Sequence, residues 1–283
     1  MNKPRWWLWP TILSLDAPVV ALLWQAMIAR SAGVALGSPA RLVLGFSVWL
    51  AYSADRWIEG FRLKPEQVRT HRHRFYIRWR WELFALWVSV LVLDVAVSIH
   101  SLSPEAFRNG LLLLLPVTAY LLSHQLLHRS SRWRVPKEAC TALLLAGGAT
   151  IFVVPPAGPS IVHIALPVVL FILLCFCNCA LISVWENEVD VSHGQTSLAL
   201  QYFAARRISR MLPWVLALSS AVAWALARPA AAQAAACAAV SATLLGAVDV
   251  LERRTGRAMA RVLADVVLMT PVVPLLLLPG GPR

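Results

Sequence analysis

The chain has 283 residues, of which 59% are hydrophobic and only 14% are charged, with a formal net charge of +12. Soluble domains are about 45–50% apolar and about 25% charged, so this composition excludes an ordinary soluble domain. The positive charges lie between apolar runs rather than on one soluble face, which argues against nucleic acid as a partner and for contact with membrane lipid.

Apolar runs follow one another along the whole chain, each about as long as the roughly 20 residues that a membrane-spanning helix needs. They cover residues 11–36, 38–60, 81–102, 107–127, 138–157, 160–185, 208–228, 230–250 and 257–279. The sequence therefore predicts an all-α membrane protein with about nine transmembrane helices in one domain, 1–283. The eighth run is crowded with alanine, and small residues let helices approach closely, so we expect this helix deep in the bundle.

Most of the 26 Lys and Arg residues fall at the N-terminus or in alternate connections between the runs. These are the second-to-third, fourth-to-fifth, sixth-to-seventh and eighth-to-ninth connections. Because cytoplasmic loops carry the excess of Lys and Arg, we expect a cytoplasmic N-terminus and an external C-terminus. The expected location is a bacterial-type inner or plasma membrane.

Two of these connections also carry paired acids. Asp55 and Glu59 lie at the end of the second run, and Glu186 and Asp190 at the end of the sixth, four residues apart in each case. On a helix this spacing puts both carboxylates on one face, where they repel each other unless a cation lies nearby. Carboxylate oxygens suit Mg²⁺, which binds to one or two carboxylates together with substrate phosphates. For a single pair of acids, ion pairs with neighbouring arginines are the alternative explanation. Two pairs of acids on the same side of the membrane favour Mg²⁺ binding.

The second acidic stretch resembles a motif of the UbiA superfamily of intramembrane prenyltransferases. That motif reads Asp-x-x-x-Asp-x-x-x-Gly-x-x-[Thr/Ser]-Leu, and here it is matched by Glu186, Asp190, Gly194, Ser197 and Leu198. Glutamate stands in place of the first aspartate. The nine-run layout, with acidic motifs after the second and sixth runs, is similar to the same family.

The first acidic stretch resembles the family's other motif, Asn-Asp-x-x-Asp-x-x-x-Asp, in its second half only. Asp55 and Glu59 match the last two acids. Ala51 and Tyr52 stand where the family has the leading Asn-Asp. The first metal-binding motif is therefore incomplete relative to the family.

The resemblance implies a fold of two four-helix bundles plus one extra helix around a central cavity. The two halves of the repeat would be about 11–127 and 138–250, with the ninth helix at 257–279. It also implies a Mg²⁺-dependent transfer of a prenyl group from a prenyl diphosphate to a lipophilic acceptor. The implied catalytic and Mg²⁺-binding residues are Asp55, Glu59, Glu186 and Asp190. The implied diphosphate-binding residues are Arg56, Lys137, Arg129 and Arg72. A terpene cyclase of the same fold, or a non-catalytic or transporter-like protein, is the alternative.

Four further acids lie inside apolar runs, where ionisable side chains are costly and are candidates for function. They are Asp16, Asp94, Asp249 and Asp265. We expect Asp249 to pair with Arg253 at the cytoplasmic end of its helix, and Asp16 to line the mouth of the cavity. For Asp94 and Asp265, helix-to-helix hydrogen bonds and a functional role are both open.

Two other sequence features have competing explanations. The stretch 69–76 is dense in arginine and histidine, and it is either a mobile cap over the diphosphate or a solvated loop that binds anionic lipid. Cys175, Cys177 and Cys179 alternate inside one apolar run, without disulfide or zinc spacing. We interpret these cysteines as small buried hydrophobic residues.

Overall fold

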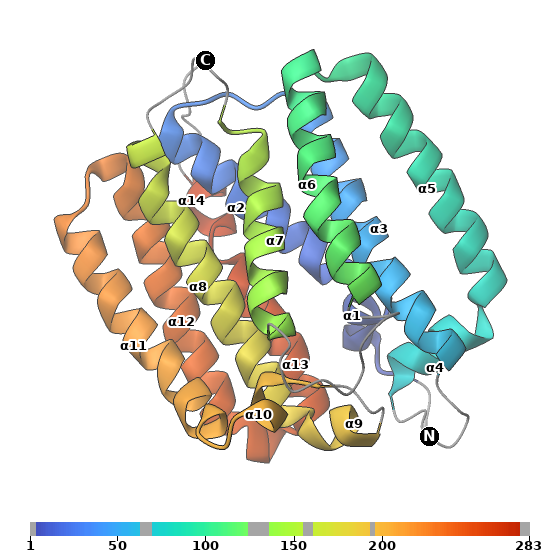
Figure 1. Cartoon of the computed structure of the whole chain (residues 1–283). Coiled ribbons are helices and arrows are strands. Elements are labelled where there is room, and N and C mark those ends of the chain that lie inside the picture. The colour runs from blue at the N-terminus through green and yellow to red at the C-terminus, as the bar shows by residue number, and fades with distance from the viewer. Residues whose placement is uncertain (1–3, 63–69, 124–135, 155–160, 193–195, 278–283) are drawn as a thin grey trace.

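The computed structural model describes residues 4–62, 70–123, 136–154, 161–192 and 196–277, and all regular structure in these ranges is helical. Figure 1 shows the helices packed side by side, with α1, α4 and α9 at one end of the molecule and α14 toward the other. The helices are α1 (Trp9–Ile12), α2 (Asp16–Ala32), α3 (Ser38–Arg62), α4 (His71–Arg78), α5 (Arg80–Ser101), α6 (Pro104–Leu122), α7 (Lys137–Ile151), α8 (Ile161–Trp185), α9 (Asn187–Ser192), α10 (Leu198–Gln201), α11 (Ala205–Leu226), α12 (Pro229–Thr255), α13 (Arg257–Val266) and α14 (Val272–Leu277), with 3-10 turns η1 (Trp6–Leu8) and η4 (Val267–Met269).

Every predicted apolar run is mainly helical in the part of the chain that the structure describes, which confirms the all-α membrane fold. Within those residues, six helices are long and apolar enough to cross a membrane, or seven if the bent pair Trp6–Ile12 and Asp16–Ala32 is one span. Neither α3, which carries charges toward both ends, nor α7, which has 15 residues, is among them. The count of nine spans stays a prediction.

The first run is not the continuous helix that the sequence predicts. Its two helical parts meet at a bend of 73°. Ser14 has a φ of 56°, a left-handed conformation that an α-helix cannot contain, so the helix ends and restarts at Asp16. The ninth run is also divided, into α13, η4 and α14.

The core lies among α2, α7, α8, α12 and α13. Trp24 of α2 stacks on Phe171 of α8, with ring centroids 4.8 Å apart, and both side chains are fully buried. Cys175 and Cys177 pack in the same core, which confirms that these two are buried hydrophobic residues. Cys179 is only half-buried and lines a cavity, so the interpretation is wrong for it.

The alanine-rich helix α12 lies deep in the bundle, as predicted. Ala234, Ala235, Ala238 and Ala242 have no exposed surface, and α12 packs against α8 and α11. Small side chains allow this close contact because the helix backbones meet with little between them.

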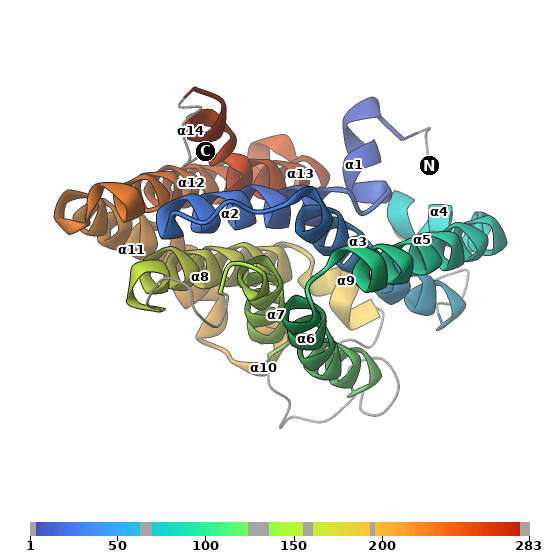
Figure 2. The same cartoon turned by 90° about the horizontal axis from the view of Figure 1, so that it is seen from above.

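Helices α5 and α6 lie at the edge of the bundle (Figures 1 and 2). Helix α5 packs against α3, and α6 packs against α7, while most of their apolar side chains stay exposed. In a bilayer, lipid chains would cover these side chains. Between these edge helices and the core lies the cavity that holds the predicted site.

Candidate active site

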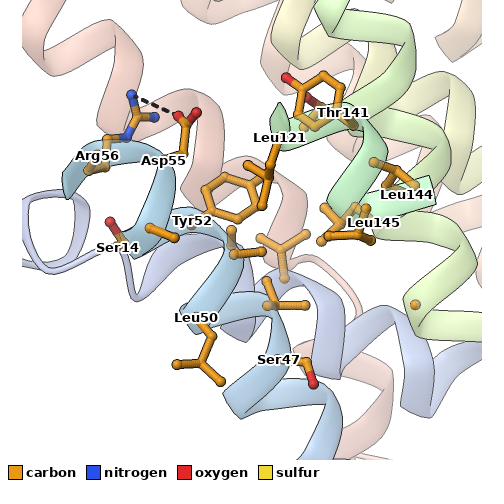
Figure 3. Close-up of a pocket in the computed structure, with 18 of the residues that line it drawn as sticks. Ser14, Ser47, Leu50, Tyr52, Asp55, Arg56, Leu121, Thr141, Leu144 and Leu145 are labelled. Carbon is orange, nitrogen blue, oxygen red and sulfur yellow. Dashed lines mark hydrogen bonds and ion pairs between the residues drawn. The ribbon is translucent and has the colours of Figure 1, made fainter. Parts of the chain in front are cut away.

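All four predicted acids line one cavity of about 710 Å³. It runs between α2, α3, α5, α6, α7, α8 and α13. Figure 3 shows Asp55 and Arg56 on α3, facing Leu121, Thr141 and Leu144 across the cavity. The walls toward α5, α6 and α7 are largely apolar, whereas the charged residues gather where α3 and α8 end. The cavity therefore has a charged end and an apolar body.

The first motif provides a carboxylate and an arginine that face each other at the end of α3. Arg56 Nη1 lies 3.3 Å from Glu59 Oε2 and 4.0 Å from Asp55 Oδ2. Glu59 is 5% exposed, so its charge depends on such partners, since a buried carboxylate is costly unless it is paired. Asp55 is less buried and faces the cavity.

Helix α4 supplies the second partner of Glu59. Thr70 caps this helix by accepting a hydrogen bond from the His73 backbone N–H. The imidazole Nε2 of His73 lies 3.1 Å from Glu59 Oε2, and its Nδ1 lies 2.6 Å from Thr70 Oγ1. Burial lowers the pKa of His73 to about 4, although the Glu59 carboxylate opposes this shift. The neutral ring therefore donates from Nε2 to Glu59 and accepts at Nδ1 from the Thr70 hydroxyl.

Arg72 connects the two motifs. It projects from α4, and its Nη2 lies 3.9 Å from Glu186 Oε2. Both Arg72 and His73 are buried, so the solvated-loop interpretation does not hold for these two residues. Residues 71–78 instead form a helix that packs against α3 and α5.

The second motif begins directly after α8. Glu186 Oε2 lies 2.6 Å from Arg261 Nη1 on α13. Burial by itself would raise the pKa of Glu186, but Arg261 and Arg72 outweigh it and hold the pKa at about 2. Asp190 Oδ1 lies 3.4 Å from Lys137 Nζ. Burial raises the pKa of Asp190 above its ordinary value, and Lys137 opposes that shift.

The first turn of α7 holds the second motif in place. Lys137 lies against Asp190, where the sequence predicts a diphosphate contact. The neighbouring Glu138 is 2% exposed, and its Oε1 accepts the backbone N–H of Leu198 at 3.0 Å. Predicted Arg129 lies outside the described residues, as does Gly194 of the motif.

Arg261 was not predicted as a site residue, because a basic residue between two apolar runs is explained by membrane topology alone. It lines the cavity and forms the shortest ion pair of the second motif. The available signal was its position four residues before Asp265 in an apolar run, because this spacing places both side chains on one face of a helix.

The intramembrane acids have three different environments. Asp94 accepts a hydrogen bond from Ser47 at 2.8 Å on the cavity wall. The predicted partner of Asp249 is wrong: this carboxylate lies 3.7 Å from Arg210 Nε and accepts the Trp185 indole N–H at 2.9 Å. Arg210 reaches Asp249 from α11, a neighbour that hydropathy does not reveal. Asp16 and Asp265 also line the cavity, although neither belongs to the two motifs.

The donor chemistry of this site suits Mg²⁺, because the carboxylates of Asp55, Glu186 and Asp190 line one cavity. No three His, Cys, Asp or Glu side chains among the described residues converge on a single point. Mg²⁺ keeps several water ligands and needs only one or two carboxylates when substrate phosphates complete its shell. The residues present therefore fit such an ion. Glu59 is already engaged by Arg56 and His73.

Neither a protein-family model nor a curated protein sequence matches the chain. Among solved structures, the chain is similar to the apo structure of a UbiA homolog from Aeropyrum pernix K1, with a TM-score of 0.56 and 15% sequence identity. The similarity covers 93% of this chain and 98% of that one. The chain thus has the fold of that homolog, which confirms the resemblance at the level of the fold.

Proposed function

We propose that this multi-pass membrane protein is a Mg²⁺-dependent prenyltransferase, which transfers a prenyl group from a prenyl diphosphate to a lipophilic acceptor. One observation carries the proposal: the charged end of the cavity, with both acidic motifs and four cationic side chains, opens into an apolar body. The cations are Arg56, Arg72, Lys137 and Arg261. This distribution matches a substrate with an anionic head and a long apolar tail.

The four cationic side chains would bind the diphosphate by charge-assisted hydrogen bonds. When the allylic C–O bond breaks, the electron pair leaves with the diphosphate, and the same side chains stabilise the added negative charge. Glu186, Asp190 and Asp55 would hold Mg²⁺, which neutralises part of that charge when it is bound. Glu59, engaged by Arg56 and His73, would position these two side chains.

The apolar walls would keep water away from the allylic cation until the acceptor attacks it. The new bond forms between the acceptor atom and the allylic carbon, and the acceptor loses a proton. Side chains such as Leu91 of α5 and Leu114 of α6 supply these walls. Since α5 and α6 lie at the edge of the bundle, a long prenyl tail could extend from the cavity toward lipid.

The variant Asp190→Asn tests the proposal. With purified protein in lipid nanodiscs, farnesyl diphosphate, Mg²⁺ and 4-nonylphenol as a lipophilic acceptor, we expect wild-type protein to release diphosphate, and the variant and chelator-treated protein to release at least about 100-fold less. Glu188→Gln is the matched control, because Glu188 lies on the same short helix but is largely exposed and outside the cavity. Full turnover by Asp190→Asn would rule out this assignment.

The products separate the alternatives. A terpene cyclase would release diphosphate and yield a hydrocarbon without any acceptor. A transporter would move the ligand across liposomes and release no diphosphate. A prenyltransferase yields the coupled product only when an acceptor is present.

A further inference from the structure

A second polar cluster lies on the inner wall of the same cavity. It consists of Asp16 at the start of α2, Asn178 in α8 and Asp265 in α13. The Asn178 amide Nδ2 donates to Asp265 Oδ1 at 3.0 Å, and the Asp16 carboxyl group lies close enough to that of Asp265 for the two to interact. None of these residues belongs to either acidic motif.

The break in the first run places Asp16 in this cluster. Because the left-handed Ser14 ends the preceding helix, Asp16 becomes the first residue of α2, and its carboxylate accepts the backbone N–H of Ala17 at 2.9 Å. The start of a helix favours a negative charge. Helix α2 is held against η4, the turn that follows α13, by Trp24, whose indole N–H donates to the Leu268 carbonyl at 2.9 Å. Asp16 and Asp265 are therefore brought together by the packing of α2 against the segment after α13, and both are half-buried on the cavity wall.

A hydroxyl group bound beside Asp16 and Asp265 would donate its hydrogen bond to a carboxyl oxygen, since a carboxylate only accepts. Neighbouring carboxyl groups on a cavity wall are suited to acid–base work, because they can take the proton of a bound group.

Asn178 indicates that a ligand completes this cluster. Asn178 is 6% exposed, and its side-chain nitrogen donates to Asp265. Its oxygen, Oδ1, is buried without a hydrogen-bond partner in the described part of the chain, although Asn178 itself lines the cavity. A buried acceptor without a donor is costly, so the missing partner is an O–H or N–H group.

The cluster lies one helical turn from the charged end of the cavity. Arg261, four residues before Asp265 on α13, binds Glu186 of the second motif. Tyr52, which stands where the family motif has an acid, lines the same wall and is close enough to Asp16 and Asp265 to interact electrostatically. A molecule bound at the cluster would therefore lie beside the allylic end of a bound prenyl diphosphate.

We propose that Asp16, Asn178 and Asp265 form the acceptor site, which binds the hydroxyl group of a lipophilic alcohol or phenol and takes its proton. This inference rests on the prenyltransferase function proposed above. The acceptor hydroxyl donates to the cluster, its oxygen forms the bond to the allylic carbon, and its proton moves to the Asp16–Asp265 pair. The diphosphate leaves with the electron pair of the broken C–O bond, so charge and atoms balance.

Binding tests the site without turnover. The probes are 4-nonylphenol and its methyl ether, which has the same tail but no hydroxyl donor, titrated onto wild-type protein in nanodiscs. We expect wild-type protein to bind the phenol about tenfold more tightly than the ether, the effect of about one hydrogen bond to a buried group. Asn178→Leu and Asp265→Asn should remove this preference. Equal binding of both probes by wild-type protein would overturn the proposal.

Turnover distinguishes the acceptor site from the diphosphate site. With farnesyl diphosphate, Mg²⁺ and 4-nonylphenol, we expect Asp265→Asn to release diphosphate within about threefold of wild type but to form at least about 100-fold less farnesylated phenol, within the range that a general base contributes. In this variant water would attack the allylic carbon instead, so farnesol would form in place of the farnesylated phenol. Asp249→Asn, an intramembrane acid outside the cavity, is the control and should leave both rates unchanged.

The outcomes separate the two proposals. If Asp265→Asn forms the phenol product at the wild-type rate, or loses diphosphate release as fully as Asp190→Asn does, the acceptor site is wrong while the prenyltransferase function stands. If wild-type protein releases no diphosphate, the proposed function fails, and the phenol–ether comparison still decides whether the cluster binds a hydroxyl group.

Discussion

At the scale of residues, the charged end of the cavity is a set of acids that are each matched by a cation or a hydrogen-bond donor. Glu59 has Arg56 and His73, Glu186 has Arg261, and Asp190 has Lys137. Burying such pairs costs desolvation energy, and removing one partner leaves a buried charge without compensation. A diphosphate that enters this end of the cavity would therefore compete with the acids for the same cations.

His73 gives a residue-scale prediction about stability. Replacing it with Phe removes the donor to the buried Glu59 carboxylate, so we expect the free energy of unfolding to fall by about 1–3 kcal/mol. His73→Gln, which retains a donor, should recover part of this loss. Thermal unfolding of the purified protein in detergent measures the change.

The control is His71→Phe, two residues away on the same helix. His71 is only half-buried and lies outside the cavity, so this variant should unfold close to wild type. Equal destabilisation by His71→Phe and His73→Phe would show that α4 is sensitive to any bulky substitution rather than to the loss of the Glu59 contact.

At the scale of elements, close helix packing and helix breaks position the site. Helices α11 and α12 lie so close that a Cβ atom added at Gly246 would meet the Trp214 ring at 2.7 Å. The break before α2 brings Asp16 to the cavity, and the hydrogen bond between Ser14 Oγ and Tyr76 Oη at 3.2 Å links this break to α4. The acidic motif at the end of α3 and the cluster of Asp16, Asn178 and Asp265 are thus connected through the helix break at Ser14.

Gly246→Ala tests the contact between α11 and α12. The added methyl group would overlap the indole ring, so Trp214 must move, and we expect a loss of about 1–3 kcal/mol in unfolding free energy. Gly110→Ala on α6 is the control, because a Cβ there meets nothing within 4 Å, and alanine favours a helix over glycine. A Gly246→Ala protein as stable as the control would contradict the close contact.

At the scale of the whole molecule, α4 and α9, which carry Arg72 and Asp190 of the charged end of the cavity, lie at the same end of the bundle (Figure 1). The positive-inside pattern predicts that this end faces the cytoplasm, where a soluble diphosphate and Mg²⁺ are available. Apolar side chains on α5 and α6 remain exposed because lipid, rather than protein, is expected to cover them.

Cysteine labelling in intact cells tests this orientation. Ser103 lies at the start of α6 and Thr255 at the end of α12, and both are exposed. We expect Ser103→Cys to react with an impermeant maleimide from outside, and Thr255→Cys to react only after permeabilisation, because hydropathy and charge place them on opposite sides. The unmodified chain, whose five cysteines are buried or half-buried, measures the background. The reverse labelling pattern would invert the proposed topology.

Much of the site was predictable because its signals are local in the chain. Asp55, Glu59, Glu186 and Asp190 stand out as acids at the ends of apolar runs, and all four line the cavity. Arg261 was less visible, because a basic residue at a helix end is also an ordinary topology signal. The predicted partner of Asp249 was wrong because its actual partner, Arg210, lies on a different helix, and contacts between helices are not visible in the sequence.

Hydropathy and the spacing of acids along the chain are enough to identify the membrane class, the helical runs and the two acidic motifs, because both are properties of contiguous residues. Which side chains meet depends on how the helices pack. Asp16, Asn178 and Asp265 are far apart in the chain, and their contact depends on the break at Ser14 and on the rotation of three packed helices. Helix rotation and packing angles follow from side-chain fit across the core, which hydropathy along the chain does not encode.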